Sequence, residues 1–527
     1  MRSLLLRLAV ACIATAFLLA FAAGAGGDPG DDSHADEIGA PPPVNPLTGP
    51  GISDNMEFLD AVDSDGTINS DLAFYKSWAF VGSYDRFRIV DIKNPSDLKV
   101  LSSTNCRANQ GDLSVFKTRD ERILMLQSID RPVTAPDCTA VDTALVPEDE
   151  EGHTVNRARF GYEGLRMFDV TDPTNPKFLR FYRTACGSHT HTLVPDPKSN
   201  TMHAYVASYP LGSHITPQID RPESDPLGLT CEAPHSKISI VDIPLTDPEN
   251  GTVRTKALSS DTEFYDGDGP DGHAPGFQSC HDHQAFLPRN IVVASCAGDL
   301  QYWDISDRGD PTSADGEPHT LIQREVPTDD PETTENERWE SFDFMHNATV
   351  SWDGEVVAAV DESGGGVEAR CDAGDTKRGF TWFYPLVEPG TPVDGFDDVL
   401  GRYIIPRAQN TEVCVSHNGN VLPTTDGSRQ QVQAFYQGGN SWFDFTDPST
   451  PDELGFADLE GELGAADSWS SYWYNDVLWV NGGLNRRGAT GNRGFEAYAL
   501  YRPDGGRLNL ADWKYLNPQT QEANQAP

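Results

Sequence analysis

Histidine recurs at one position in four stretches of the sequence, each of which continues as a short apolar strand and ends in a turn. The stretches are Ser188–Leu193, Cys280–Ala285, Met345–Val350 and Ser416–Val421. Aligned on one histidine each, they superimpose His191, His283, His346 and His417. Neutral imidazoles that converge on one point bind zinc, copper, iron or nickel. The pattern therefore predicts a transition-metal site, and four histidines without a carboxylate suit a redox metal such as copper or iron better than calcium.

Two of these stretches carry a second histidine two residues earlier, His189 and His281. Side chains alternate along a strand, so His189 and His191 project the same way, as do His281 and His283. We expect this second pair to lie one layer away and to gate or extend the site. The competing interpretation is inheritance: repeats copied from one ancestor keep a histidine without any ion, and the rings only line a channel.

The four stretches belong to a longer repeat, in which an apolar strand ends in aspartate or in an aromatic pair. Its seven copies are Phe87–Pro95, Leu165–Pro173, Ile238–Ile243, Leu300–Ile305, Phe380–Tyr384, Trp442–Pro448 and Phe495–Leu500. The spacing leaves room for four strands in each unit, with the period-2 alternation and β-branched content of strands. Units of about 40–60 residues predict an all-β protein, a seven-bladed β-propeller of four-stranded antiparallel blades over residues 52–510. Near the histidine position, the first, second and last blades carry Asp71, Asp112 and Trp469 or Ser470 instead, which speaks against simple inheritance.

The repeated strand resembles the signature of the LVIVD-repeat β-propellers, and the resemblance spans roughly residues 52–510. It implies the propeller fold and almost nothing about activity. The placement of His191, His283, His346 and His417 is also similar to that in two propeller families with a metal in the channel. Carotenoid oxygenases hold iron with four histidines from separate blades, and selenium-binding proteins, which include methanethiol oxidases, have histidine-rich copper sites. This similarity implies a metal-dependent oxidoreductase.

One face of the predicted propeller collects the long connections. Excursions between second and third strands are expected at 129–162, 209–235 and 363–378, and those between fourth and first strands at 259–279, 316–344 and 388–412. In an up-and-down blade both classes emerge at the face where innermost strands begin, so the histidines should lie there too. Functional sites commonly lie on loops that a rigid scaffold positions.

The N-terminal part of the chain predicts export and closure of the ring. Arg2 and Arg7 precede an apolar run that ends in small residues, so residues 1–25 are expected to be a cleaved signal peptide, with a retained anchor as the alternative. Residues 26–51 are expected to be a flexible tether rich in Gly, Asp and Pro. Met56–Asp60 matches outer strands such as Lys177–Phe181 and is expected to complete the last blade; the alternative is an N-terminal unit without such an exchange. Residues 511–527 are expected to form a C-terminal tail.

Eight cysteines remain after the signal peptide: Cys106, Cys138, Cys186, Cys231, Cys280, Cys296, Cys371 and Cys414. An even number in an exported chain predicts up to four disulfides, although thiolate ligation is an alternative for those next to the histidines. The formal net charge of −42 argues against a nucleic-acid partner. No other stretch approaches the roughly 18 apolar residues of a membrane span, so we expect a secreted, extracellular or periplasmic protein.

Two functions fit these observations. The first is an exported metal-dependent oxidoreductase that acts on a small molecule, with copper, iron or zinc held by the histidines. The alternative is a non-catalytic extracellular or cell-surface propeller that binds a protein or a glycan through its loop-rich face, because propellers host both kinds of function. The sequence contains no G-x-S-x-G motif, no phosphate-binding loop and no dinucleotide fingerprint.

Overall fold

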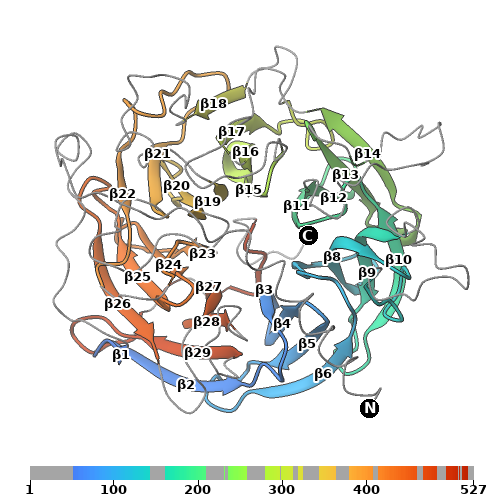
Figure 1. Cartoon of the computed structure of the whole chain (residues 1–527), viewed down its shortest axis with the longest axis horizontal. Coiled ribbons are helices and arrows are strands. Elements are labelled where there is room, and N and C mark those ends of the chain that lie inside the picture. Colours follow the sequence, from blue (N-terminus) through green and yellow to red (C-terminus); the bar gives the residue numbers. More distant parts are fainter. Residues whose placement is uncertain are drawn as a thin grey trace, which may run out of the picture. The chain divides into compact units, whose positions relative to one another are not determined.

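Each of the seven copies of the repeated strand forms the third strand of its own four-stranded antiparallel sheet. The seven sheets are arranged in a ring, which confirms the seven-bladed β-propeller (Figure 1). The computed structural model describes residues 51–142, 161–208, 231, 235–257, 279–296, 298–312, 319–323, 344–363, 379–407, 413–459, 467–482, 494–508, 510 and 513–519. The predicted signal peptide and all of the predicted tether except residue 51 lie outside this range.

The blades follow one another in chain order, and the strands of each run from the axis outward (Figure 1). Blade 1 contains β3 (Asn69–Tyr75), β4 (Trp78–Ser83), β5 (Arg86–Asp91) and β6 (Lys99–Asn105). Blade 2 contains β7 (Leu113–Lys117), β8 (Ile123–Val133), β9 (Tyr162–Asp169) and β10 (Lys177–Arg183). Blade 3 contains β11 (Thr190–Asp196), β12 (Thr201–Ala207), β13 (Lys237–Pro244) and β14 (Thr252–Ala257). Blade 4 contains β15 (Asp282–Phe286), β16 (Ile291–Cys296), β17 (Asp299–Asp304) and β18 (His319–Gln323).

The remaining blades are built in the same way. Blade 5 contains β19 (Met345–Val350), β20 (Val356–Asp361), β21 (Thr381–Pro385) and β22 (Gly401–Tyr403). Blade 6 contains β23 (Gly419–Val421), β24 (Gln430–Ala434), β25 (Asn440–Asp444) and β26 (Asp452–Asp458). Blade 7 contains β27 (Ser468–Tyr474), β28 (Val477–Gly482) and β29 (Phe495–Leu500), and its outer strand is β2 (Met56–Val62). Two short strands extend other sheets: β1 (Gly51–Ile52) pairs with β26, and β30 (Tyr515–Leu516) pairs with β3.

The aspartate that closes the repeated strand ends it through a local hydrogen bond. In blades 1, 2, 4 and 6 its side chain accepts the backbone N–H two residues further on, as Asp91 does from Lys93 and Asp444 from Thr446. Such a turn competes with the strand ladder and therefore stops it at that residue. The aspartate recurs in the sequence because it ends the third strand in each of these blades.

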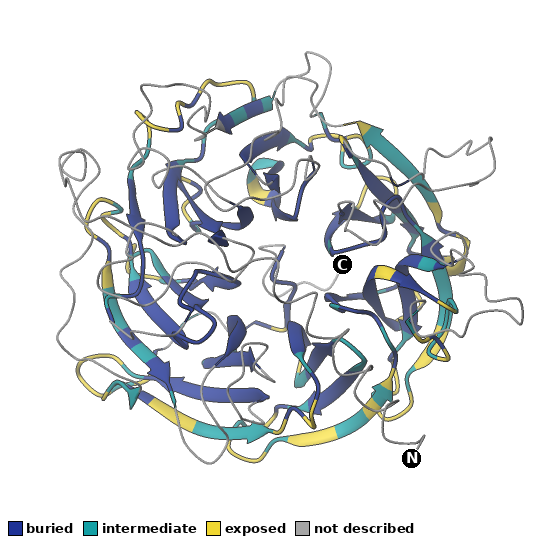
Figure 2. Ribbon diagram, in the orientation of Figure 1, coloured by how far each residue is buried: buried dark blue, intermediate teal, exposed yellow. Residues whose placement is uncertain are grey.

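Burial falls from the axis to the rim of the ring (Figure 2). Every residue of innermost strands such as β3 and β19 is buried, whereas outer strands such as β6 and β14 are half-buried or exposed. Innermost strands are covered on both faces by neighbouring blades, so their polar residues are buried together with their apolar ones. The channel end of each blade is consequently a rigid support for side chains.

The N-terminal strand closes the ring, as the sequence predicted. β2 pairs with β29 in antiparallel register from Met56 opposite Leu500 to Val62 opposite Phe495. A strand from the N-terminal part of the chain therefore completes the last blade, and an edge that would otherwise expose unpaired N–H and C=O groups is covered.

The two ends of the ring differ, again as predicted. First-to-second strand turns lie at one end, which we call the short-turn face, and the connections from second to third and from fourth to first strands lie at the other, the loop-rich face. Two excursions expected between fourth and first strands contain a fourth strand instead: 316–344 contains β18 and 388–412 contains β22. Residues 386–400 therefore connect a third strand to a fourth and belong to the short-turn face. Among the described residues, no helix is long and apolar enough to span a membrane.

Disulfides cross-link the loop-rich face. Cys106 pairs with Cys138, Cys186 with Cys231, and Cys280 with Cys296, and Cys414 is disulfide-bonded as well. All cysteines within the described residues are therefore oxidised, which confirms the prediction of disulfides. Cys371 lies outside the described residues.

Candidate metal centre

Four histidine rings lie in a row at the loop-rich end of the channel, and we call them the histidine cluster. The ring centroids of His189 and His281 are 4.2 Å apart, those of His281 and His346 are 4.0 Å apart, and those of His346 and His417 are 4.1 Å apart. One ring comes from each of blades 3 to 6, and all four are buried. The sequence correctly anticipated one histidine per blade over these four blades.

In blades 3 and 4, the histidine that belongs to the cluster lies two positions earlier in the sequence than the predicted one. The structure brings His346 and His417 together with His189 and His281, which the sequence analysis placed one layer away, and not with His191 and His283. The backbone explains the register, because the N–H groups of His189, His281 and His417 each donate to the second strand of their blade, at Ala207, Ser295 and Ala434. In blade 5 an irregularity between Met345 and Asn347 places His346 at the same level.

A tight turn delivers the first ring of the cluster. Gly187, two residues before His189, has a φ of +73°, and a Cβ atom there would lie 2.8 Å from the backbone oxygen of Ile129. Only glycine tolerates both the left-handed conformation and this close approach. Cys186 precedes it and is tied to Cys231. The disulfide and the glycine together fix the path of the chain into His189.

A carboxylate that the sequence analysis did not single out completes the group. Glu362 follows the last residue of β20, and its oxygens lie 3.6 Å from Nε2 of His346 and 3.6 Å from Nε2 of His417. The ligand atoms of His281, His346 and Glu362 all lie within 4.8 Å of one another, and the three residues are buried. A buried carboxylate beside histidines at a strand end is therefore the feature that makes this a candidate metal centre. The hydroxyl of Tyr436 donates a hydrogen bond to Glu362.

The outward nitrogen of three rings is fixed by a hydrogen-bond acceptor. Nδ1 of His189 lies 3.0 Å from Oδ1 of Asp130, and Nδ1 of His281 lies 3.0 Å from the backbone oxygen of His346. Nδ1 of His417 donates to the backbone oxygen of Trp469. A proton held on Nδ1 leaves the lone pair on Nε2, and this is the usual way in which a metal-binding histidine is oriented.

Burial keeps the central imidazoles neutral. It lowers the pKa of His281 and of His346 well below the ordinary value, and repulsion by the neighbouring imidazoles lowers both pKa values further. Neutral imidazole is the form that binds metal. Nδ1 of His346 is buried with no hydrogen-bond partner.

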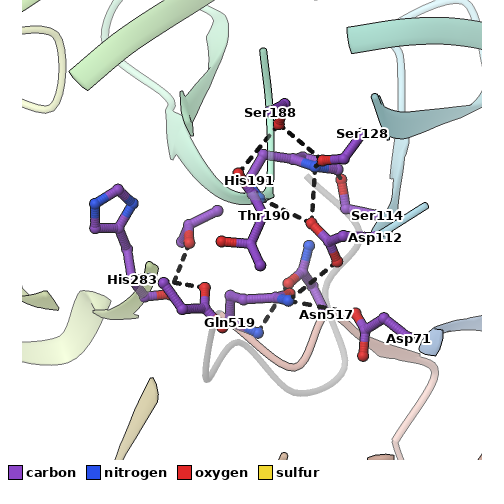
Figure 3. Close-up of polar contacts among 12 residues, drawn as sticks. Asp71, Asp112, Ser114, Ser128, Ser188, Thr190, His191, His283, Asn517 and Gln519 are labelled. Carbon is purple, nitrogen blue, oxygen red and sulfur yellow. Dashed lines mark hydrogen bonds and ion pairs between the residues drawn. The ribbon is translucent and has the colours of Figure 1, made fainter. Parts of the chain in front are cut away.

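His191 belongs to a different network, deeper in the channel (Figure 3). Its Nδ1 lies 2.9 Å from Asp112 and 2.9 Å from Ser128, and its Nε2 lies 2.5 Å from Oγ of Ser114. The order aspartate, histidine, serine is that of a hydrolytic triad. Ser114 has an exposure of 0 %, so no substrate reaches its hydroxyl, and the network holds blades 2 and 3 together.

His283 also lies apart from the cluster. Figure 3 shows its ring directed away from His191, and its ring centroid lies 5.1 Å from that of Trp303. Both ring nitrogens are buried without a hydrogen-bond partner, and burial lowers the pKa of His283 to about 3. The ring is thus a neutral, packed side chain.

The cluster opens onto a small polar cavity, which we call the chamber. Beside the four rings of the cluster, it is lined by Ser70, Asp71, Gln110, Asp112, Trp469 and Gln519. The positions at which blades 1 and 2 carry aspartate and blade 7 carries tryptophan therefore do face the histidines, as their sequence register indicated. Thiolate ligation does not occur here, because Cys186, Cys280 and Cys414 are all disulfide-bonded.

The fold and the site together define a seven-bladed β-propeller with a buried His/Glu group at one end of its channel. The chain matches no protein-family model and no curated protein. It is similar in fold to solved structures, two of which share low sequence identity with it. One is the computationally designed Ika8 protein, with 9 % identity, 84 % of this chain and 100 % of that chain covered, and a TM-score of 0.39. Another is a chain of the Mitotic Checkpoint Complex, with 8 % identity, coverage of 86 % and 98 %, and a TM-score of 0.43. Neither likeness bears on the chemistry of the site, and the resemblance to LVIVD-repeat propellers rests on the repeated strand alone.

Proposed function

We propose that this protein is an exported metal-dependent oxidoreductase, with a transition-metal ion held at the loop-rich end of its channel by His281, His346 and Glu362. The observation that carries the proposal is the convergence of these three buried side chains, with ligand atoms within 4.8 Å of one another. His189 and His417 complete the row and are the candidates for further ligands.

The separations suit a shared ion better than hydrogen bonds. Hydrogen bonds between nitrogen and oxygen span about 2.7–3.2 Å, whereas the Glu362 oxygens lie 3.6 Å from Nε2 of His346 and 3.6 Å from Nε2 of His417. Two ligand atoms that each lie about 2.1 Å from one ion are about 3.0–3.4 Å apart. A small inward movement of these side chains would therefore enclose an ion.

The donor set restricts the metal. Imidazole nitrogen with one carboxylate suits zinc, copper, iron or nickel, and it does not suit calcium or magnesium, which prefer oxygen ligands. When bound, a redox-active ion of this group would supply electron transfer or the activation of oxygen species, and this is the basis for the reaction class that we propose.

The chain's own residues prepare the site for that chemistry. Asp130 and two backbone oxygens orient three rings, so that little reorganisation is needed on binding. The hydroxyl of Tyr436 donates a hydrogen bond to Glu362 and so holds the carboxylate in place. Trp469 packs 4.8 Å from the ring of His417 and covers that side of the cluster. The buried setting excludes bulk water and strengthens every electrostatic interaction within the site.

Metal analysis of the full-length secreted protein tests the proposal. After dialysis against metal-free buffer, we expect stoichiometric copper, iron or zinc by inductively coupled plasma mass spectrometry. The variants His281→Ala, His346→Ala and Glu362→Gln should each lose most of this metal. His283→Ala is the matched control, because His283 is equally buried in the next layer of blade 4 and lies outside the cluster.

The outcomes separate the metal from the reaction class. If the purified protein holds no metal after incubation with these ions, or if the cluster variants keep as much as His283→Ala, the metal centre is wrong and a non-catalytic binding propeller takes its place. Electron paramagnetic resonance then tests the redox role. A site that holds only zinc, which has no redox chemistry of its own, would keep the metal centre and contradict electron transfer by the ion.

A further inference from the structure

The last described segment of the chain, Trp513–Gln519, lies inside the ring, and we call it the C-terminal plug. The red C-terminal segment occupies the middle of the ring in Figure 1. β30 pairs with β3, with Tyr515 opposite Tyr75 and Leu516 opposite Phe74. Because Tyr75 is the end of β3 at the short-turn face, this antiparallel register sends the chain from that face into the channel and towards the histidine cluster.

The plug is anchored as firmly as core strands. Trp513, Leu516 and Asn517 have exposures of 1 %, 4 % and 0 %. The Trp513 ring lies 5.8 Å from that of Trp352 in blade 5, although β30 pairs with blade 1, so the segment joins opposite parts of the ring. Chain ends are ordinarily frayed unless such contacts hold them. In the C-terminal plug, the packing of Trp513 and the pairing of β30 with β3 provide these contacts.

The polar end of the plug reaches the chamber. The backbone oxygen of Gln519 accepts a hydrogen bond of 2.7 Å from the N–H of Ala285 in β15. Its side-chain Nε2 donates to Asp71 and to Asp112, both at 3.3 Å (Figure 3). Gln519 thus touches blades 1, 2 and 4 at one level, and it lines the chamber together with the four rings of the cluster.

We propose that the C-terminal plug seals the channel beneath the histidine cluster and that Gln519 is the positioning residue that forms the floor of the chamber. Ions and small ligands then exchange with the cluster through the loop-rich face alone. The plug also holds Asp71 and Asp112 at the chamber wall, so the C-terminal residues are part of the site and not an appended tail. The inference concerns access to the cluster and needs the metal of the proposed function only for one arm of its test.

Access can be measured without any metal, by acylation of the metal-free protein with diethylpyrocarbonate and mass mapping of the modified histidines. We expect Gln519→Ala, and more strongly a chain that ends at residue 510, to accelerate acylation of His281 and His346 by about tenfold, since each removes part of the barrier to opening. A chain that ends at Gln519 is the matched truncation control and should react like the wild type. His203, which bonds Asp242 within blade 3, is the internal control and should be unaffected.

Two results would overturn the proposal. One is an unchanged acylation rate of His281 and His346 in a folded Gln519→Ala protein, and this variant decides the matter if the longer truncation does not fold. The other is a parallel increase at His203, which would show general loosening. In metal-loaded protein, loss of the ion to a chelator should accelerate in the same order of variants. If no variant ever holds metal, the proposed metal centre fails while the acylation rates still judge the plug.

Discussion

At the scale of single residues, the chamber contains two adjacent buried carboxyl groups whose pKa values are shifted in opposite directions. Burial raises the pKa of Asp71 well above its ordinary value, and the neighbouring Asp112 raises it further. Burial acts on Asp112 in the same direction, but the charge and hydrogen bonds of His191 outweigh it and bring the pKa of Asp112 below its ordinary value. Asp71 therefore keeps its proton to a higher pH than an ordinary aspartate, whereas Asp112 ionises more readily.

We therefore expect the two aspartates to respond differently to the same substitution. At about pH 4, where the raised pKa of Asp71 has not yet lowered the stability of the wild type, Asp71→Asn replaces a protonated carboxyl by a neutral amide and should change the free energy of unfolding by less than about 1 kcal/mol. Asp112→Asn leaves His191 without its buried charged partner and should cost about 2–4 kcal/mol. Urea unfolding of both variants measures the difference, and equal losses would contradict the assignment of the charge.

The pH dependence gives the same pair a second test. A group whose pKa is raised by folding stabilises the folded state relative to the unfolded state at low pH, and this contribution is lost as pH rises from the ordinary value of about 3.9 through the raised one. The Asp71→Asn variant has no titrating group at this position, so its stability does not fall in this way as the pH rises. The stability of this variant relative to the wild type should therefore increase as the pH rises above about 4. A pH-independent difference would show that Asp71 is ionised.

The sequence predicted which blades contribute histidines, and it misjudged which histidine of each pair does so. Two histidines separated by one residue on a strand point the same way, so alternation alone cannot choose between His189 and His191. The spacing to the aspartate of the following turn distinguishes the two histidines. His189 precedes Asp196 by seven positions, and His346 likewise precedes Asp353 by seven. Glu362 was missed because its position beside the cluster depends on the pairing of β20 with β19, which no local pattern shows.

At the scale of elements, the strand that closes the ring is the one whose loss has the clearest consequence. Met56 of β2 has an exposure of 5 % and belongs to the core between blade 7 and its neighbours, whereas the adjacent Glu57 is exposed. Met56→Ala should cost about 2–3 kcal/mol through the cavity that it leaves. Glu57→Ala is the control and should stay within about 0.5 kcal/mol. Urea midpoints that move equally would mean that β2 does not support the ring in solution.

Element prediction succeeded where a repeat supplied several copies and failed where an element occurs once. Seven Asp-ended or aromatic strands identified every third strand, and the resemblance of Met56–Asp60 to outer strands identified β2. β22 and β30 have three and two residues, too few for alternation to be visible. The plug was therefore read as part of a tail, although its pairing with β3 is what brings Gln519 into the chamber.

At the scale of the whole molecule, the ring follows from the period of the repeat, and the placement of the site follows from the ring. Innermost strands that begin at the loop-rich face bring one residue per blade to the same end of the channel. That much is implied by topology, and it explains why the histidine cluster lies at the face where the sequence placed the histidines. The precise ligand set is not implied, because it depends on differences of a few ångströms that side-chain packing and hydrogen bonds decide.

Charge is the other property of the whole molecule with a testable consequence. A formal net charge of −42 implies that repulsion among carboxylates opposes the folded state. Screening shortens from about 10 Å at 0.1 M salt to about 3 Å at 1 M, so sodium chloride should raise the melting temperature over that range. Exposed ion pairs such as those of Arg429 with Asp353 and Glu355 are weakened by the same salt, but each contributes at most about 1 kcal/mol. We therefore expect differential scanning calorimetry to show a net rise in melting temperature with sodium chloride. Sucrose is the uncharged control, and it should raise the melting temperature no more than it does for a reference protein of low net charge. A melting temperature that falls as sodium chloride increases would mean that the ion pairs outweigh the net repulsion.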